Sequence, residues 1–303
     1  MTQASTLDTA SLSGFRASLL PHRTAWPRLL LVMAHPDDEY ALAATTYRVT
    51  RELAGLADHV VITNGEGGYR YASLAQTVYG VSIAREPDGR ANLSAIRRQE
   101  TVNAGRILGI RRQHFLEQPD PGFAGRCADA ESKQWDSTFL RRSLAAVLSE
   151  QDYDFAFTLL PRPDGHGHHR AAAELLLDAV AELPEPRRPV VLGVEAGRIG
   201  EPAPPFAGFG AYPAAGTFPA FVFDRNARFG HEGALNYQIV ANWVVAEHKS
   251  QGLFQTDCGK YDAERFWVFS TAPGVLDRAH VLARKLLDRN AALIEGLDQA
   301  GAL

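Results

Sequence analysis

The stretch Leu29-Leu30-Leu31-Val32-Met33-Ala34-His35-Pro36-Asp37-Asp38-Glu39 decides the fold of this 303-residue chain. Its apolar part, residues 29–34, is bounded by polar residues and is typical of a strand buried on both faces of a mainly parallel sheet. Pro36 has no N–H and keeps His35 out of helical dihedral angles, so the chain turns where this strand ends. Open α/β sheets bind ligands beyond the carboxyl ends of their strands. Because clustered ionisable groups are costly there unless a cation or a reaction uses them, the stretch predicts a divalent-metal site.

Strand-like and helix-like segments alternate along the rest of the chain. This alternation is typical of a Rossmann-like three-layer α/β/α body with right-handed crossovers. We expect residues 1–26 to form an N-terminal extension and residues 27–303 to form a single domain. Residues 197–233 are rich in Pro, Gly and aromatic side chains, and we expect an insertion or substrate lobe of loops and short strands over the site. Strands are expected at 28–34, 59–63, 113–116, 155–160, 189–194, 218–224 and 265–270, helices at 39–56, 93–108, 135–150, 171–183, 235–252 and 276–297, and an irregular segment at 74–92.

Composition and charge narrow the function classes. The formal net charge is -4 and 46% of the residues are hydrophobic, which permits a large core and argues against a nucleic-acid-binding surface. Cys127 and Cys258 fit reduced thiols in a cytosolic protein, although one bridge stays open. The first twenty-odd residues lack the pattern of a secretory signal, and no apolar run approaches the roughly 20 residues that span a bilayer. We therefore expect a soluble cytoplasmic protein, either monomeric or a homo-oligomer.

A second cluster of ionisable residues follows the strand expected at 155–160. It contains His166, His168 and His169 within four positions, just before a strongly helical run. Catalytic zinc takes three protein ligands and leaves one position for water. His35 and Asp38 are three residues apart across a turn and can reach one ion, and His169 at the helix start is the best-fixed third ligand. Two nitrogens and one carboxylate oxygen suit Zn²⁺, with Fe²⁺, Co²⁺ and Mn²⁺ as alternatives and with His166 or His168 as alternative ligands.

The remaining polar residues beside this site indicate a hydrolytic reaction. Asp37 is left over next to the predicted ligands, and a carboxylate there is the expected general base for a water whose pKa the metal lowers towards about 7. The oxyanion that forms needs a further donor, and a protonated His166 could serve. This chemistry predicts hydrolysis of an amide or ester.

A glycine-rich loop, Gly65-Glu66-Gly67-Gly68, follows the second expected strand. It matches neither a P-loop nor a dinucleotide fingerprint, and a tight turn with positive φ accounts for its glycines. Glu66 is not explained in this way and is a candidate substrate contact. Arg97 and Glu100 share one helical face, where the alternative is a surface ion pair of little energetic value. The other histidines are expected to be partly exposed structural residues: His59, His114, His231 and His280.

In order along the chain, these motifs resemble the PIG-L/LmbE-like family of metal-dependent de-N-acetylases. The resemblance covers roughly residues 28–180, with a looser match at His248-x-Ser250-Gln251. It implies a Rossmann-like body with Zn²⁺ at the carboxyl edge of the sheet. It also implies that His35, Asp38 and His169 are the ligands and that Asp37 is the general base. His166 would stabilise the tetrahedral intermediate or protonate the leaving amine.

The resemblance further implies a small-molecule amino-sugar substrate, from which an N-acetyl group of an N-acetylglucosaminyl unit is removed. Glu66 and Arg97 match positions that contact the sugar, and Asp120 matches a further one. His248 would either support a metal ligand or lie close to the substrate. His168 replaces the acidic residue of the family's usual His-Pro-Asp-His loop. The alternatives are an amidase or esterase of another small conjugate at the same metal, and a catalytically silent carbohydrate-binding protein.

Overall fold

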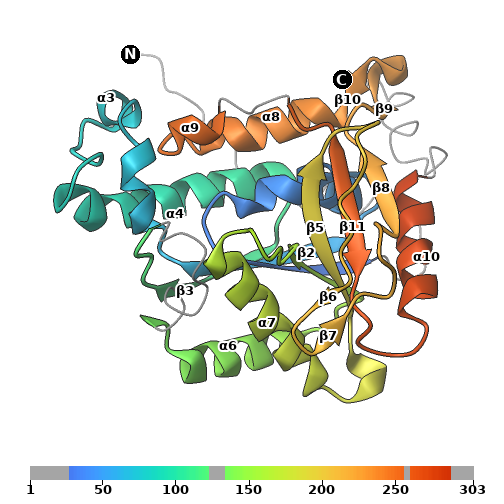
Figure 1. Cartoon of the computed structure of the whole chain (residues 1–303). Helices are drawn as coiled ribbons and strands as arrows, with labels where there is room; N and C mark the ends of the chain where they lie inside the picture. The colour runs from blue at the N-terminus through green and yellow to red at the C-terminus, as the bar shows by residue number, and fades with distance from the viewer. Residues whose placement is uncertain (1–26, 123–133, 256–259, 288–303) are drawn as a thin grey trace, which may run out of the picture.

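The computed structural model describes residues 27–122, 134–255 and 260–287. In this part of the chain, a seven-stranded sheet has the order β3-β2-β1-β4-β5-β11-β8 (Figure 1). The first five strands in that order run parallel, whereas β11 runs antiparallel to both β5 and β8. The sheet is therefore mainly parallel, as predicted. Its strands are β1 (Arg28–Met33), β2 (Leu56–Thr63), β3 (Arg112–Gln118), β4 (Phe155–Leu159), β5 (Val190–Gly197), β8 (Phe221–Asp224) and β11 (Ala263–Val268).

Helices cover both faces of the sheet, so the three-layer α/β/α prediction is confirmed (Figure 1). The helices α6 and α7 lie on one face, and α4, α8 and α10 lie on the other. The longer helices are α4 (Asp88–Leu108), α6 (Ser137–Glu150), α7 (Gly167–Ala181), α8 (Tyr237–Glu247) and α10 (Val275–Leu287). Short elements complete the described chain: η1 (Asp38–Leu42), α2 (Ala43–Tyr47), η2 (Arg48–Glu52), η3 (Glu66–Tyr71), α3 (Ala75–Tyr79), η5 (Glu185–Arg187), β6 (Gly208–Phe209), β7 (Tyr212–Pro213), β9 (Arg228–Phe229), η6 (His231–Gly233), β10 (Leu235–Asn236) and α9 (Gly252–Gln255).

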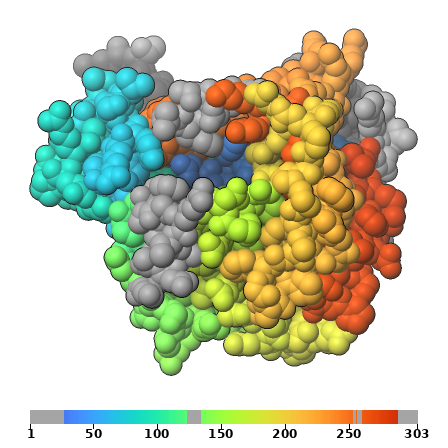
Figure 2. Space-filling model, viewed as in Figure 1, coloured from blue at the N-terminus to red at the C-terminus, as the bar shows by residue number. Residues whose placement is uncertain are grey.

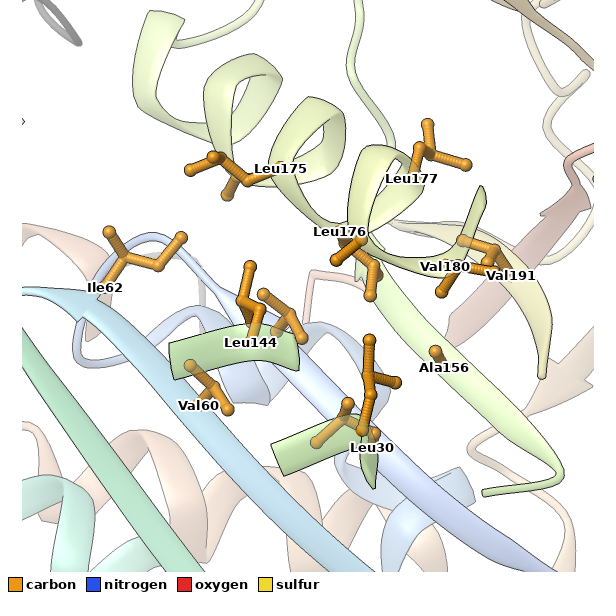
Figure 3. Packing of buried hydrophobic residues seen from close by; sticks show 14 of the residues in the cluster. Leu30, Val60, Ile62, Leu144, Ala156, Leu175, Leu176, Leu177, Val180 and Val191 are labelled. Atoms are coloured by element: carbon orange, nitrogen blue, oxygen red, sulfur yellow. The ribbon is translucent and has the colours of Figure 1, made fainter. Parts of the chain in front are cut away.

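The central strand β1 packs against both helical layers. Leu30 points toward α6 and α7, where it joins a cluster with Leu144 and Leu176 (Figure 3). The next residue, Leu31, points the other way and packs in the cluster that contains Leu282 of α10. All of these side chains are buried, and each contributes about 1.5–3 kcal/mol relative to an exposed leucine. The continuous apolar run of β1 therefore follows from burial on two faces.

The strand order reverses at β1, which places the two predicted site loops side by side. From β1 the chain adds β2 and then β3 on one side of the sheet, and it later adds β4 and then β5 on the other. The pairing of Leu29 with Phe155 and of Leu31 with Phe157 aligns the exits of β1 and β4. A crevice at such a reversal is where open α/β sheets bind ligands.

The helix expected at 39–56 consists of three short segments, η1, α2 and η2. The backbone N–H groups of Ala44 and Thr45 at the start of α2 donate to the buried carboxylate of Glu264, at 2.8 and 2.9 Å. Because these donors bond to β11, the chain breaks from regular helix here. The segment ends before Gly55, where a Cβ would lie 2.6 Å from the carbonyl oxygen of Pro27.

Two helices begin earlier than predicted. The helix expected from residue 93 is α4, which begins at Asp88, and the segment expected to be irregular also contains α3. The end of α4 at Gly109, with φ of 69°, agrees with the prediction. The helix expected from residue 171 is α7, which begins at Gly167 and therefore includes His168 and His169 in its first turn.

Residues 197–233 contribute to the sheet edge and to the face covered by α7. In this segment β8 pairs with β11, and the hydroxyl of Tyr212 in β7 donates to Asp178 of α7 at 2.6 Å. The expected N-terminal extension, Cys127 and Cys258 all lie outside the described residues. Within the described part of the chain, no helix is both long and apolar enough to cross a membrane.

Candidate metal centre

Three side chains converge beyond the exits of β1 and β4: His35 and Asp38 from the turn after β1, and His169 from the first turn of α7. The Nδ1 atom of His35 lies 3.2 Å from Nε2 of His169 and 3.5 Å from Oδ2 of Asp38. The Oδ1 atom of Asp38 lies 3.3 Å from Nε2 of His169. Bonds of about 2.0–2.2 Å to a tetrahedral Zn²⁺ place its ligand atoms roughly 3.3–3.6 Å apart. With one ligand atom from each residue, all within 4.8 Å of one another, the three residues that the sequence predicts as ligands could hold a single ion.

Local contacts hold Asp38 and His35 in this arrangement. The backbone N–H of His35 donates to Oδ2 of Asp38 at 2.8 Å, so one carboxylate oxygen braces the turn while the other faces His169. Burial acts to raise the pKa of Asp38, but His169 and His35 outweigh it and hold the pKa well below its ordinary value. The carboxylate is therefore kept charged, which is the form that binds a cation.

His168 contacts the opposite nitrogen of His35. Its Nδ1 lies 2.9 Å from Nε2 of His35, and the Oδ1 atom of Asp120 lies 3.8 Å from the same Nδ1. His168 is fully buried. His35, His166 and His168 also have ligand atoms within 4.8 Å of one another and form a second group that could hold an ion.

We assign the ion to His35, Asp38 and His169, because that group supplies a carboxylate and borders a cavity. The Nδ1 atom of His166 is already used, since it accepts the backbone N–H of His168 at 3.1 Å and caps α7. The ligand set stays a prediction that this geometry supports.

Asp37 occupies a strained position beside the ligand group. Its φ is 115° and its ψ is -18°, a region that residues other than glycine rarely adopt. Such strain often marks functional sites, where the surrounding structure holds it in place. The Oδ2 atom of Asp37 lies 2.9 Å from Nη2 of Arg97, and its backbone N–H donates to Oε2 of Glu39 at 3.1 Å. Burial raises the pKa of Asp37 to about 6, although Arg97 acts in the opposite direction.

Arg97 links the glycine-rich loop to the Asp37 turn. Its Nη1 donates to the carbonyl oxygen of Gly65 at 2.8 Å, and its Nη2 contacts the carbonyl oxygen of Pro36. A Cβ on Gly68 would lie 2.7 Å from Nη1 of Arg97. The turn with positive φ predicted for the glycines occurs at Gly65, at 70°, whereas a Cβ on Gly68 would displace the Arg97 side chain from its contact with Gly65.

The alternative of a surface ion pair between Arg97 and Glu100 is wrong. Both residues are 2% exposed, and their side chains bind different partners. The two carboxylate oxygens of Glu100 accept the backbone N–H and the hydroxyl of Ser250, at 2.7 and 2.6 Å. Glu100 therefore anchors the segment that contains His248, whose Nε2 lies 2.7 Å from Oε1 of Glu39 in a fully buried pair. His248 supports Glu39, which in turn binds the backbone of Asp37.

The predicted substrate contacts lie around the metal-ligand group, and none of them lines its cavity. Arg97 and His248 are buried, and Asp120 is 3% exposed. Glu66 is half-buried; its Oε1 accepts the backbone N–H of Asp120 at 2.9 Å, while its Oε2 is buried with no hydrogen-bond partner among the described residues. The substrate role of these four residues stays a prediction.

A cavity of about 420 Å³ borders Asp37, Asp38 and His169. Figure 2 shows the molecule hollowed here, with the blue segment that follows β1 at the floor between the cyan, lime-green and yellow parts of the chain. The cavity is also lined by Arg162 and Glu195, two polar residues that the sequence reasoning did not select. A usable signal was present, because both residues follow the apolar runs of β4 and β5 at the same edge of the sheet. The remaining lining residues are Tyr40, Ala41, Leu159, Leu160, Gly165, Val194, Ala196 and Tyr261.

This fold and site define an α/β protein with a histidine–carboxylate group that could hold a metal ion at the strand-order reversal. The PIG-L family model, described as GlcNAc-PI de-N-acetylase, matches residues 30–180. Residues 30–180 therefore carry a PIG-L family domain, and the resemblance read from the sequence is confirmed.

Two curated relatives have names that describe amino-sugar deacetylases. The chain is 28% identical over 167 residues to the probable N-acetyl-alpha-D-glucosaminyl L-malate deacetylase 2 of Bacillus anthracis, covering 55% of this chain and 65% of that protein. It is 31% identical over 171 residues to the 1D-myo-inositol 2-acetamido-2-deoxy-alpha-D-glucopyranoside deacetylase 3 of Catenulispora acidiphila, covering 52% of this chain and 46% of that protein. Both alignments span less than two thirds of the relative.

Two solved structures share the fold at low identity. A deacetylase triple mutant of the teicoplanin biosynthetic pathway has a TM-score of 0.51 at 15% identity, covering 82% of this chain and 99% of that one. The 4-carboxy-2-hydroxymuconate hydratase of Pseudomonas putida KT2440 has a TM-score of 0.50 at 15% identity, covering 80% and 95%. Because the same body occurs in a deacetylase and a hydratase, the reaction must be argued from the site.

Proposed function

We propose that this protein is a metal-dependent hydrolase that removes the N-acetyl group from an N-acetylglucosaminyl-type small molecule. The observation that carries the proposal is the position of Asp37, which lines the cavity next to the group formed by His35, Asp38 and His169. The family match and the names of both curated relatives support the choice of substrate class.

The ligand group suits zinc, and its two nitrogens and one carboxylate oxygen would also accept Fe²⁺, Co²⁺ or Mn²⁺. An ion held there would act as a Lewis acid, lowering the pKa of a water and polarising the acetyl carbonyl. His35, Asp38 and His169 would hold it from one side. The cavity on the other side leaves room for the substrate amide.

Asp37 acts as the general base. Its carboxylate takes a proton from the attacking water, and the oxygen of that water forms the new bond to the acetyl carbon. When the C–N bond breaks, Asp37 returns this proton to the leaving amine. The products are acetate and the amino sugar. Arg97 keeps the carboxylate oriented through its contact at 2.9 Å.

His166 stabilises the oxyanion as a neutral imidazole. Because its Nδ1 accepts the backbone N–H of His168, the ring proton of the neutral form is on Nε2, which can donate a hydrogen bond. Burial lowers the pKa of His166 to about 3, and the neighbouring His35 and His169 act in the same direction. A protonated His166 is therefore not favoured. Of its two roles suggested by the resemblance, stabilising the tetrahedral intermediate is the better supported.

The test is an acetate-release assay with N-acetylglucosaminides, run beside aryl esters and cysteinyl amides. We expect acetate from the N-acetylglucosaminides and little turnover of the other two classes. Asp37→Ala should lose the activity while keeping its bound metal. Preferred hydrolysis of the esters or cysteinyl amides would favour the other small-conjugate hydrolases. Sugar binding without acetate release over long incubation would favour a carbohydrate-binding protein.

A further inference from the structure

A fully buried ion pair packs against the segment that follows Asp37 and Asp38, and the proposed reaction does not use it. Nε of Arg225 donates to Oε1 of Glu264 at 3.1 Å, and both side chains are 0% exposed. Arg225 directly follows β8 and Glu264 lies in β11, so both residues are outside the segment 30–180 that the family model matches. Resting on the proposed function, we propose that Arg225 and Glu264 are positioning residues, which hold the turn of Asp37 and Asp38 in the geometry that binds the ion.

The pair binds the backbone of the segment that follows the turn. Nη2 of Arg225 donates to the carbonyl oxygen of Tyr40 in η1 at 2.6 Å, and the guanidinium carbon lies 4.4 Å from the centre of the Tyr40 ring. Oε1 and Oε2 of Glu264 accept the backbone N–H groups of Ala44 and Thr45, at 2.8 and 2.9 Å. Two residues from the antiparallel end of the sheet therefore hold η1 and the start of α2 in place.

A backbone hydrogen bond connects Tyr40 to the metal-ligand turn. The N–H of Tyr40 donates to the carbonyl oxygen of Asp37 at 3.2 Å. Asp37 has a φ of 115°, which persists only where the surrounding structure holds it. A shift of the Tyr40 backbone would therefore move Asp37 and Asp38 relative to His169.

The chemistry of the pair suits positioning better than stabilisation. A buried ion pair loses much of its attraction to desolvation, and apolar replacements of such pairs are often equally stable or more stable. A guanidinium, however, carries its donors in a rigid fork that binds several acceptors in fixed directions. Arg225 uses all three of its side-chain nitrogens in this way, since Nη1 also donates to the carbonyl oxygen of Tyr261 at 3.2 Å. Tyr40 and Tyr261 both line the cavity, so the arginine also fixes one of its walls.

The experiment measures zinc affinity by competition titration, and kcat of the zinc-loaded protein on an N-acetylglucosaminide. Arg225→Met removes the donors but keeps a side chain of similar length. It should weaken zinc binding by about 10–100-fold, the usual effect of losing a residue that orients metal ligands. Its kcat should fall by about tenfold or more, because Asp37 is displaced from the attacking water. Arg225→Lys keeps one charged donor group and should lose less than Arg225→Met.

A neutral double variant separates positioning from stability. Arg225→Met leaves Glu264 buried without its partner, which by itself lowers the melting temperature. Adding Glu264→Gln removes the unpaired charge, so the double variant should melt above Arg225→Met. Its zinc affinity should nevertheless stay about 10–100-fold below that of the wild type, because the Tyr40 carbonyl still lacks its donor. The double variant and Arg225→Lys also carry the test if Arg225→Met does not fold.

The matched control is a second buried ion pair, Arg48 with Glu52 in η2, whose side chains are 7% and 4% exposed. Its carboxylate accepts the hydroxyl of Tyr237 in α8 at 2.8 Å. Arg48→Met, Glu52→Gln and their double variant should leave zinc affinity and kcat unchanged, although the single variants also leave one buried charge without its partner.

Wild-type zinc affinity and kcat in the neutral double variant of Arg225 and Glu264 would overturn the positioning role. Equal losses in the Arg48 and Glu52 variants would also overturn it. Wild-type protein that binds zinc but releases no acetate would overturn the deacetylase proposal alone. Weaker zinc binding in the Arg225 variants would then still support the positioning role, because that measurement needs no substrate. A wild type that binds no zinc would overturn both.

Discussion

Oδ2 of Asp37 lies 2.9 Å from Nη2 of Arg97, and the guanidinium is almost completely buried. The contact joins the proposed base to the glycine-rich loop, because the same arginine binds the carbonyl oxygen of Gly65. Burial raises the pKa of Asp37 to about 6, and Arg97 limits that rise by favouring the charged carboxylate. Arg97 therefore keeps Asp37 in the form that can accept a proton.

The first prediction concerns the pH profile of Arg97 variants. A base must be deprotonated to act, so kcat/KM should fall as the pH drops through the pKa of Asp37. Arg97→Gln removes the charge that lowers this pKa, and the acidic limb of the profile should move to higher pH, whereas Arg97→Lys should shift it less. Arg98→Gln is the matched control, because Arg98 pairs with Glu117 on the surface. An acidic limb that stays in place in Arg97→Gln would contradict this role.

The second prediction separates metal binding from base catalysis. Asp37→Ala should keep the bound metal and lose about 10²–10⁴-fold in kcat, the usual contribution of a general base. His169→Ala should lose both the metal and the activity, because its Nε2 is one corner of the ligand group. Metal content per chain, measured after dialysis, distinguishes the two variants. Full activity of Asp37→Ala would remove that residue from the mechanism.

The third prediction concerns His168, which contacts Nε2 of His35 at 2.9 Å. Residues that orient a ligating histidine through its second nitrogen typically change metal affinity by about 10–100-fold. His168→Ala should weaken zinc binding by that factor in a competition titration, and His168→Asp should restore most of it. His231→Ala serves as the control, because His231 is exposed in η6. Unchanged zinc affinity in His168→Ala would show that the contact does not orient His35.

The fourth prediction concerns stability. His248 and Glu39 form a pair in which both side chains are fully buried, so removing one partner leaves the other charge without compensation. His248→Ala should lower the free energy of unfolding by about 3–5 kcal/mol in urea denaturation. Lys249→Ala, at an exposed neighbouring position, should change it by no more than about 0.5 kcal/mol. A loss below 1 kcal/mol in His248→Ala would show that the pair is not a support of the Asp37 turn.

Local patterns in the sequence predicted the parts of the fold and site that depend on neighbouring residues. The apolar run 29–34 and the turn at Pro36 predicted the central strand and the position where it ends. The histidines after β4 predicted that this segment faces His35 and Asp38 in the candidate metal-ligand group. Contacts between residues far apart in the sequence could not be predicted from local patterns. Glu100 and Ser250 are 150 residues apart, and only the packed structure shows that one anchors the other.

Burial on both faces of the sheet also explains one wrong prediction. His59 was expected to be partly exposed, but it lies in β2 and is fully buried. A strand covered by helices on both sides has no face exposed to solvent. A polar residue in such a strand therefore does not indicate an exposed position. Arg162 and Glu195 were not selected because each is a single charged residue after an apolar run, and the fold brings them to one cavity.

The most direct test of the account is the acetate-release rate of chelator-stripped protein as zinc is returned in measured amounts. With an N-acetylglucosaminide as substrate, the account predicts that stripping abolishes the rate. It also predicts that about one equivalent of zinc restores it in the wild type and not in the His169→Ala variant. A stripped protein that releases acetate as fast as the untreated protein would contradict the central claim that one ion, held by His35, Asp38 and His169, is required for the reaction.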